Sequence, residues 1–353
     1  MTDLDERITS TLREHAEGAV DSHRLLRDSV ARGRRRRLRR RAVTGTALAL
    51  AGVLGFVGVT GPGPGRLADR LPWTAATPSV GAPVPPRVDG MPGAAADPTR
   101  VGADPNLLHF GVDPARARLL TWRTGGGVEG GRLDLGGGRV VAVDLATDAA
   151  AVERSVHEGM TYPDGPVTAA GFDGGVQRVS SPGPGGQPGW FLRWQPVPGL
   201  YARVHTVAAD AGVLREAVAA LRLDEARRCA TPLRLTTLPL DASVAGCEVS
   251  VVGFPDSLDV LLTVTRPGGQ RLDVRLEYGS DVPRRRTQGN RTIGDRAGYV
   301  PPHGGELELL GVDRAYVTAR FGPPYRGFTE ADATVVLGGA RLADDLSRPS
   351  TWE

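Results

Sequence analysis

The sequence predicts an α+β fold outside a membrane, attached to a short helical cytoplasmic tail by one transmembrane helix. Three observations predict it: an uncharged apolar stretch behind a run of arginines, a Pro-, Gly- and Ala-rich segment after it, and alternating strand and helix patterns over the rest of the 353 residues. The predicted boundaries are 1–41 for the tail, 42–61 for the membrane helix, 62–105 for a linker, 106–226 and 227–347 for two α+β subdomains, and 348–353 for a C-terminal tail.

The membrane helix is predicted from the stretch Ala42–Thr60, which has no charged residue. At 1.5 Å per residue it spans about 28 Å, the thickness of a bilayer core. The basic residues directly before it are Arg34, Arg35, Arg36, Arg37, Arg39, Arg40 and Arg41. Because such residues stay in the cytoplasm, we expect a single-pass plasma-membrane protein with its N-terminus inside and its C-terminal region extracytoplasmic. The arginines would lie against anionic lipid headgroups, which makes membrane lipid an expected partner.

Two other interpretations of this stretch remain. A secretory signal peptide would be cleaved, with a possible site at Thr74-Ala75-Ala76, and a twin-arginine export signal could begin at Arg40-Arg41. Both would also export the C-terminal region.

The distribution of charge supports the same topology. The net charge of the chain is +3, yet residues 1–41 alone hold 12 Arg against 7 Asp and Glu. The chain has no lysine, which excludes P-loop nucleotide hydrolysis and pyridoxal chemistry. Together with 48 Gly and 28 Pro, this composition is typical of a GC-rich, actinobacterial genome.

The tail is predicted to contain two short amphipathic helices. The first places Leu4, Ile8 and Leu12 on one face, and Asp21 can cap the second. Helices this short cannot bury their apolar faces alone. We therefore expect Leu4, Ile8 and Leu12 to contact a partner protein, the other helix or the membrane surface.

Each outer half is predicted to contain strands followed by a terminal helix. In the first half we expect a strand Arg139–Ala146, a helix over 149–158, a hairpin of Trp190–Trp194 with Leu200–Val207, and a helix after Asp210. In the second half we expect strands Ser257–Thr265, Gln270–Tyr278, Glu306–Leu310 and Ala315–Phe321, then a helix that opens at Thr329-Glu330-Ala331-Asp332 and turns Val335, Val336 and Leu342 inward. The similar endings of the halves suggest an internal duplication.

Cys229 and Cys247 are the only cysteines. In an oxidising compartment we expect them to form a disulfide, which would contribute about 3 kcal/mol of stability. Two buried free thiols are the alternative.

Motifs for catalysis and metal binding are missing. The sequence has no GxSxG, HExxH or CxxC and no GxGxxG beside a predicted strand, and the outer histidines His109, His157, His205 and His303 are scattered. We expect no enzyme activity, cofactor or metal, although a carboxylate pair formed by folding stays possible. The basic residues Arg284, Arg285, Arg286, Arg291 and Arg296 are expected to form a solvated loop, or to bind an anionic polymer.

The segment LDERITSTLREHAEGAVDSHRLLRDSVARGRRRRLRRRAV and the apolar stretch after it, residues 3–60, resemble actinobacterial single-pass membrane proteins encoded beside extracytoplasmic-function sigma factors. The resemblance implies an anti-sigma-like regulator that contacts a sigma factor through residues 1–41. The chain departs from the zinc-binding anti-sigma pattern, because its tail has no Cys and only His15 and His23.

The hypothesis that follows is a non-enzymatic membrane regulator with an envelope-sensing outer region. We expect an envelope ligand and no nucleic acid, since topology explains the arginine run better. The alternatives are an anchored envelope-binding or scaffold protein without a signalling role, and a cell-wall hydrolase or transferase.

Overall fold

A computed structural model describes residues 82–154, 171–179, 188–280, 282, 288–323 and 327–352. The chain divides into two units, Met1–Ala75 and Ala76–Glu353, and every described residue belongs to the second. The predicted tail helices and the stretch Ala42–Thr60 lie outside the described residues. Within the described ranges, no helix has both the length and the apolar character that crossing a bilayer requires.

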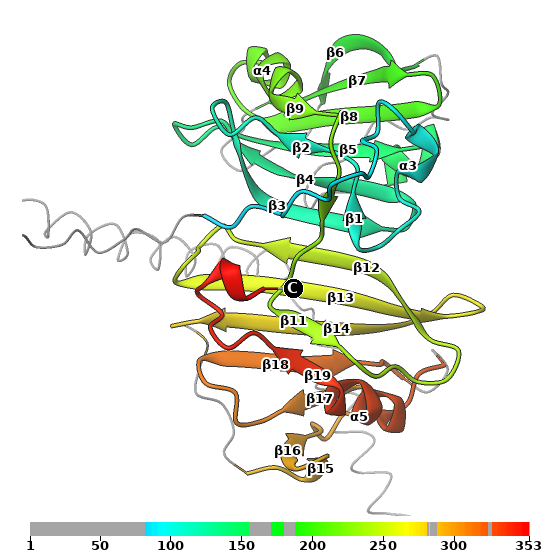
Figure 1. Ribbon diagram of the computed structural model, residues 1–353, viewed down its shortest axis with the longest axis vertical. Coiled ribbons are helices and arrows are strands. Elements are labelled where there is room, and N and C mark those ends of the chain that lie inside the picture. The colour runs from blue at the N-terminus through cyan, green and yellow to red at the C-terminus, as the bar shows by residue number, and fades with distance from the viewer. Residues whose placement is uncertain are drawn as a thin grey trace, which may run out of the picture. The chain divides into compact units, whose positions relative to one another are not determined.

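The described fold is built on one antiparallel sheet of thirteen strands, so the region has more strand and less helix than the predicted α+β fold. The strands lie in the order β15-β16-β17-β18-β14-β13-β12-β3-β4-β5-β8-β7-β6 (Figure 1). The first half of the sheet consists of β3 (Arg118–Gly125), β4 (Val128–Asp134), β5 (Val140–Ala146), β6 (Asp173–Val179), β7 (Gly189–Val197) and β8 (Leu200–Val207). The second half consists of β12 (Ser243–Ser250), β13 (Ser257–Arg266), β14 (Gln270–Gly279), β15 (Arg291–Ile293), β16 (Arg296–Tyr299), β17 (Glu306–Leu309) and β18 (Ala315–Arg320).

Shorter elements complete the described fold. The two-stranded pairs are β1 (Leu107–Leu108) with β10 (Arg227–Arg228), β2 (Gly111–Val112) with β9 (Leu221–Arg222), and β11 (Leu233–Leu235) with β19 (Ala340–Leu342). The α-helices are α3 (Ala149–Arg154), α4 (Gly212–Ala220) and α5 (Glu330–Gly338), and the 3-10 helices are η1 (Pro98–Arg100) and η4 (Pro349–Thr351).

The two halves repeat one strand order. In the first half the sheet runs β3-β4-β5-β8-β7-β6, and in the second it runs β12-β13-β14-β18-β17-β16 with β15 added at the edge. After β8 the chain forms α4 and then β9, which pairs with β2; after β18 it forms α5 and then β19, which pairs with β11. This repeated topology is what an internal duplication would produce, whereas the subdomain boundary at 226/227 stays a prediction.

The register repeats as well. A bulge interrupts the β3–β4 ladder between Leu119 and Thr121, and a matching bulge interrupts the β12–β13 ladder between Val244 and Gly246. Aligning the bulges makes Arg123 the counterpart of Glu248. These two residues face each other where β3 pairs with β12, so an approximate two-fold axis passes through this pair.

The two faces of the sheet differ in composition. Helices α4 and α5 pack on one face over the main hydrophobic core, which includes Trp122, Val143, Val204, Val260 and Val317. Successive residues of a strand point to opposite faces, so the alternate positions form the other face. Because many of these positions are charged, we call it the charged face. Helix α3 covers part of it, with Val152 packed in a small cluster beside Val128 and Phe172.

The predicted strands are confirmed within one residue at their ends, except that β7 continues three residues past the predicted end, to Val197. The last helix begins as predicted, since Thr329 and Asp332 form a reciprocal capping box. Its apolar assignment is partly wrong: Val336 is buried, but Val335 is 41% exposed, and Leu342 belongs to β19 because the helix ends at Gly338. The predicted helix over 149–158 is described only to Arg154.

The outer part of the predicted linker, residues 82–105, is instead a part of the fold. Ala94 and Val101 are buried, and the Ala94 N–H donates to the His109 carbonyl at 2.7 Å. The fully buried Glu129 carboxylate accepts from the backbone N–H groups of Gly102 at 2.8 Å and His109 at 2.5 Å. Its Oε1 also lies 2.6 Å from the His109 ring Nδ1. Prolines here favour an extended chain, and these contacts attach that chain to the sheet.

Cys229 and Cys247 form the expected disulfide. Cys229 follows β10, in the connection between the halves, and Cys247 is in β12, whose neighbours are β3 and β13. Both cysteines are buried in the main core. The bond therefore attaches the connection to the strand at the junction.

Candidate ligand-binding cleft at the junction of the two halves

A row of charged residues crosses the junction on the charged face. The antiparallel register aligns one residue of each strand, and residues directly opposite each other point to the same face. From β12 to β7 the row consists of five charged residues and one glycine, in the order Glu248, Arg123, Gly130, Asp144, Arg203 and Arg193.

Asp144 is at the centre of a buried ionic network. Its side chain is fully buried and pairs with Arg123 through Oδ1 and with Arg203 through Oδ2, the latter at 2.7 Å. The Nδ1 atom of His205 lies 4.0 Å from the same Oδ2. A carboxylate in an apolar interior is costly unless it is paired, and the two guanidinium groups meet that requirement.

Gly130 allows this network to cross β4. A Cβ atom built there would lie 2.5 Å from the Val143 carbonyl oxygen and 2.9 Å from Asp144 Oδ1. It would also lie 3.3 Å from Arg123 Nε. Any side chain at this position would therefore displace the Arg123–Asp144 pair.

Helix α3 is held on the charged face by Glu153. Its carboxylate pairs with Arg193, with 2.9 Å between Arg193 Nη2 and Glu153 Oε2, and lies 3.5 Å from Arg203 Nη1. The Arg193 guanidinium also stacks over the Phe191 ring, 4.2 Å from its centroid. Among the described residues, these ion pairs connect Arg123, Arg193 and Arg203 with Asp144 and Glu153.

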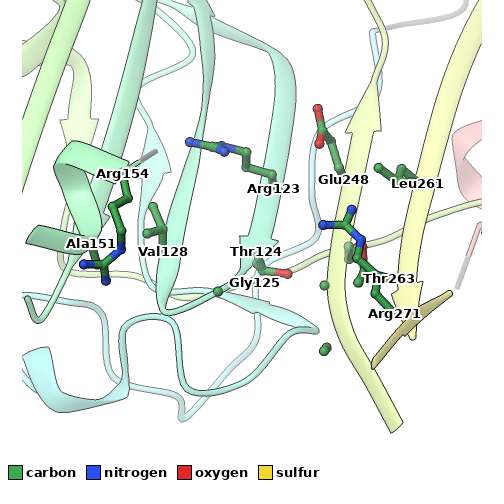
Figure 2. Close-up of a pocket in the computed structure, with 14 residues that line it drawn as sticks. Arg123, Thr124, Gly125, Val128, Ala151, Arg154, Glu248, Leu261, Thr263 and Arg271 are labelled. Atoms are coloured by element: carbon green, nitrogen blue, oxygen red, sulfur yellow. The ribbon is translucent and has the colours of Figure 1, made fainter. Parts of the chain in front are cut away.

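A cleft of about 380 Å³ lies beside this network, with lining residues from both halves. Figure 2 shows Ala151 and Arg154 of α3 on one side, Thr263 and Arg271 on the other, and Gly125 between them. Gly125 faces Gly246 across the β3–β12 pair.

These glycines allow β3 and β12 to approach closely at the cleft. A Cβ at Gly125 would lie 2.8 Å from the Ala245 carbonyl oxygen, and a Cβ at Gly246 would lie 3.1 Å from the Thr124 carbonyl oxygen. A side chain at Gly125 would therefore press on the backbone of the other strand.

The second half of the charged face is crowded with carboxylates. Burial raises the pKa of the Asp259 carboxyl above its ordinary value, and the nearby Glu277 and Glu248 raise it further. The Arg275 guanidinium, 2.6 Å from Asp259 Oδ2, lowers the pKa of Asp259, but not enough to return it to its ordinary value. For Arg275, burial lowers the pKa, but the bond to Asp259 and the surrounding acids outweigh burial and raise it.

This crowding gives a testable pH dependence. Because folding raises the pKa of Asp259, its contribution to stability is fully present below the unfolded pKa, near 4, and is lost as pH rises through the folded pKa. We expect the variant Asp259→Asn to gain stability relative to wild type as pH rises through that window, measured by urea unfolding at several pH values.

Asp134→Asn is the matched control. The backbone N–H of Gly136 lowers the pKa of Asp134, and Arg118 adds to this effect, so its stabilisation is present above the unfolded pKa and is lost as pH falls through the folded pKa. This variant should lose stability relative to wild type as pH rises. The same trend in both variants would contradict the assignment for Asp259.

A second cavity, of about 760 Å³, lies at the start of α5. His303, Glu306, Arg320, Phe321 and Phe328 are among its lining residues. It belongs to the second half alone and lies next to residues that are not described.

The structure separates the remaining predicted residues. Among the basic stretch, Arg284, Arg285 and Arg286 lie outside the described residues, while Arg291 pairs with Glu330 near the start of α5. His157 is not described, and His109, His205 and His303 lie at three different places. Over the described ranges, no group of three or more His, Cys, Asp or Glu side chains could hold a metal ion.

The sequence analysis did not predict the network, although three of its residues interrupt apolar runs of the sequence. Asp144 interrupts the apolar run RVVAVDLA, Arg203 interrupts LYARVHTV, and Arg193 interrupts GWFLRW. A single charge in the middle of a buried strand is rarely tolerated unless it is paired. Three such charges in neighbouring strands indicate a network.

Comparisons with known proteins identify no family. No family model and no curated protein match the chain. Among solved structures, the chain is similar to the "Crystal structure of MucB in complex with MucA(peri)", with 12% identity over 66% of this chain and 90% of that chain. The TM-score is 0.20, which is too low to support a shared fold.

Proposed function

We propose that the chain is a non-enzymatic, single-pass membrane regulator. Its outer sheet would bind a ligand in the envelope, and its N-terminal tail would contact a cytoplasmic protein. The observation that carries the proposal is the uncharged stretch Ala42–Thr60 directly behind the arginines that end at Arg41.

The disulfide supports an extracytoplasmic outer region. Disulfides persist in oxidising compartments and are rare in the cytosol. The Cys229–Cys247 bond lies on the C-terminal side of the proposed membrane stretch, where that stretch would place it outside the cell.

The cleft supports a binding role for the outer region. Its lining comes from α3 and from strands of both halves, so one ligand can contact elements that are distant in sequence. A ligand that binds one arrangement of these elements more tightly shifts the population toward that arrangement. Such a shift is what a sensing domain requires.

The membrane part of the proposal can be tested with export reporters. We expect alkaline phosphatase, which is active only outside the cytoplasm, to be active when fused after Glu353 and inactive when fused after Gly33. The full-length product should stay in membranes during an alkaline carbonate wash. An inactive fusion at Glu353, or a product that washes off, would contradict the topology.

The regulatory part needs a separate test. If a sigma factor is encoded beside this chain, a two-hybrid assay of residues 1–41 against it should be positive, and replacing Leu4, Ile8 and Leu12 together by Asp should abolish the signal. Ser10→Asp, on the opposite face of the predicted helix, is the matched control and should leave the signal unchanged. A negative result with the intact tail would favour an anchored scaffold or envelope-binding protein instead.

A further inference from the structure

We propose that the cleft at the junction binds phosphodiester groups, which occur in lipid headgroups and in anionic wall polymers. The inference rests on the proposed function, since it names the class of ligand that the outer region would sense. Its direct support is a set of three arginines that line the cleft from different elements: Arg123 from β3, Arg154 from α3 and Arg271 from β14.

Arg271 is oriented by a neighbour that leaves most of its donors available. Its Nε donates to Asp273 Oδ1 at 2.6 Å. Both terminal nitrogens of a guanidinium carry two N–H donors each, and this bond uses neither. The side chain is 56% exposed at the edge of the cleft.

Arg154 and Arg271 lie on opposite sides of the cleft (Figure 2). Its ion pair is long, with 3.5 Å between Nη2 and Asp148 Oδ2, and both side chains are largely exposed. An exposed pair of this kind contributes little stability, so a ligand can replace it at low cost.

The buried network brings a third guanidinium group to the cleft. Arg123, which lines the cleft, pairs with the Asp144 carboxylate, and Arg203 pairs with the same carboxylate. Guanidinium groups bind phosphate oxygens with strong charge-assisted hydrogen bonds. A tetrahedral phosphate accepts hydrogen bonds from several directions, so arginines on different sides of one cleft suit it better than they suit a planar carboxylate.

Among the described residues that line the cleft, Glu248 is the only one with a carboxylate. It is exposed and sits opposite Arg123 in register. An anion in the cleft would be repelled by it, so this residue limits affinity. Removing its charge should strengthen binding, a result that a purely structural role for the arginines would not produce.

The experiment measures binding to the detergent-solubilised full-length chain in an uncharged detergent. The probes are poly(glycerol phosphate) and a short-chain phosphatidylglycerol, with short-chain phosphatidylcholine for comparison. We expect wild type to bind at least one anionic probe, with affinity that falls as salt increases. Arg154→Gln together with Arg271→Gln should weaken binding about tenfold or more, because about 1.4 kcal/mol corresponds to a factor of ten and each lost charged hydrogen bond contributes at least that much.

Two matched variants control the result. Glu248→Gln should bind more tightly than wild type, and Arg215→Gln, an exposed arginine on α4 at the opposite face, should leave affinity unchanged. Binding of the polymer alone identifies a wall polymer as the source, binding of the lipid alone identifies a headgroup, and binding of both identifies the shared phosphodiester.

Two outcomes would overturn the inference. Wild type could bind neither anionic probe, or the Arg154/Arg271 double variant could bind as tightly as wild type. Either outcome leaves the export and two-hybrid results unaffected, so the proposed function can stand while the inference fails.

Discussion

Replacing Asp144 by alanine is expected to lower the free energy of unfolding by about 3–5 kcal/mol, the cost of removing one member of a buried ion pair. The fully buried Arg203 would then lose its 2.7 Å ion pair with Asp144, while its longer contact with Glu153, at 3.5 Å, would remain. Arg123 would lose its pair with the same carboxylate. Urea unfolding of the outer region, followed by circular dichroism in the full-length chain, measures the effect.

Glu216→Ala is the matched control for this prediction. Its ion pair with Arg139 has a similar distance, 2.6 Å, but both side chains are about half exposed. Solvent screening reduces such a pair to under about 1 kcal/mol. If the two variants lose the same stability, burial is not what makes the Asp144 network important.

Removing the disulfide with Cys229→Ala and Cys247→Ala is expected to cost about 3 kcal/mol, because the unfolded chain regains the freedom of a loop between cysteines 18 positions apart. Wild type unfolded in the presence of a reductant should lose a similar amount. Both cysteines are buried, so a thiol reagent should label them only after reduction and unfolding.

The double variant is its own control for this effect. Its stability should not change when reductant is added, since it has no sulfur to reduce at these positions. A variant as stable as oxidised wild type would show that the fold already restricts this connection without the bond.

The strands could be predicted from the sequence because each has a local pattern. Ser257–Arg266 and Gln270–Gly279 alternate apolar and polar residues around a Pro-Gly-Gly turn, which is sufficient to place a hairpin. Thr329 and Asp332, which lie three residues apart, similarly identify the start of a helix. Such signals lie within a few positions of each other.

The cleft could not be predicted, because its parts meet only through long-range pairing. Arg123 reaches Asp144 across β4, and β3 meets β12 after more than a hundred intervening residues. The prediction of a linker before β1 failed for a related reason. The prolines of that segment indicate a linker, but Glu129 in β4 accepts hydrogen bonds that attach the segment to the sheet. The composition of the segment itself does not indicate that a residue as distant in sequence as Glu129 accepts its hydrogen bonds.

The pairing of β3 with β12 has a consequence for how the cleft became asymmetric. In a dimer of identical chains, a residue on the two-fold axis can only meet its own copy, so an arginine there would face an arginine and a glutamate a glutamate. Here Arg123 and Glu248 occupy those two places within a single polypeptide, where each can be substituted independently. The same freedom lets one half hold α3 over its charged face while the described part of the other half leaves its acids without a covering helix. A repeated architecture encoded in one chain can therefore present a site with two different sides.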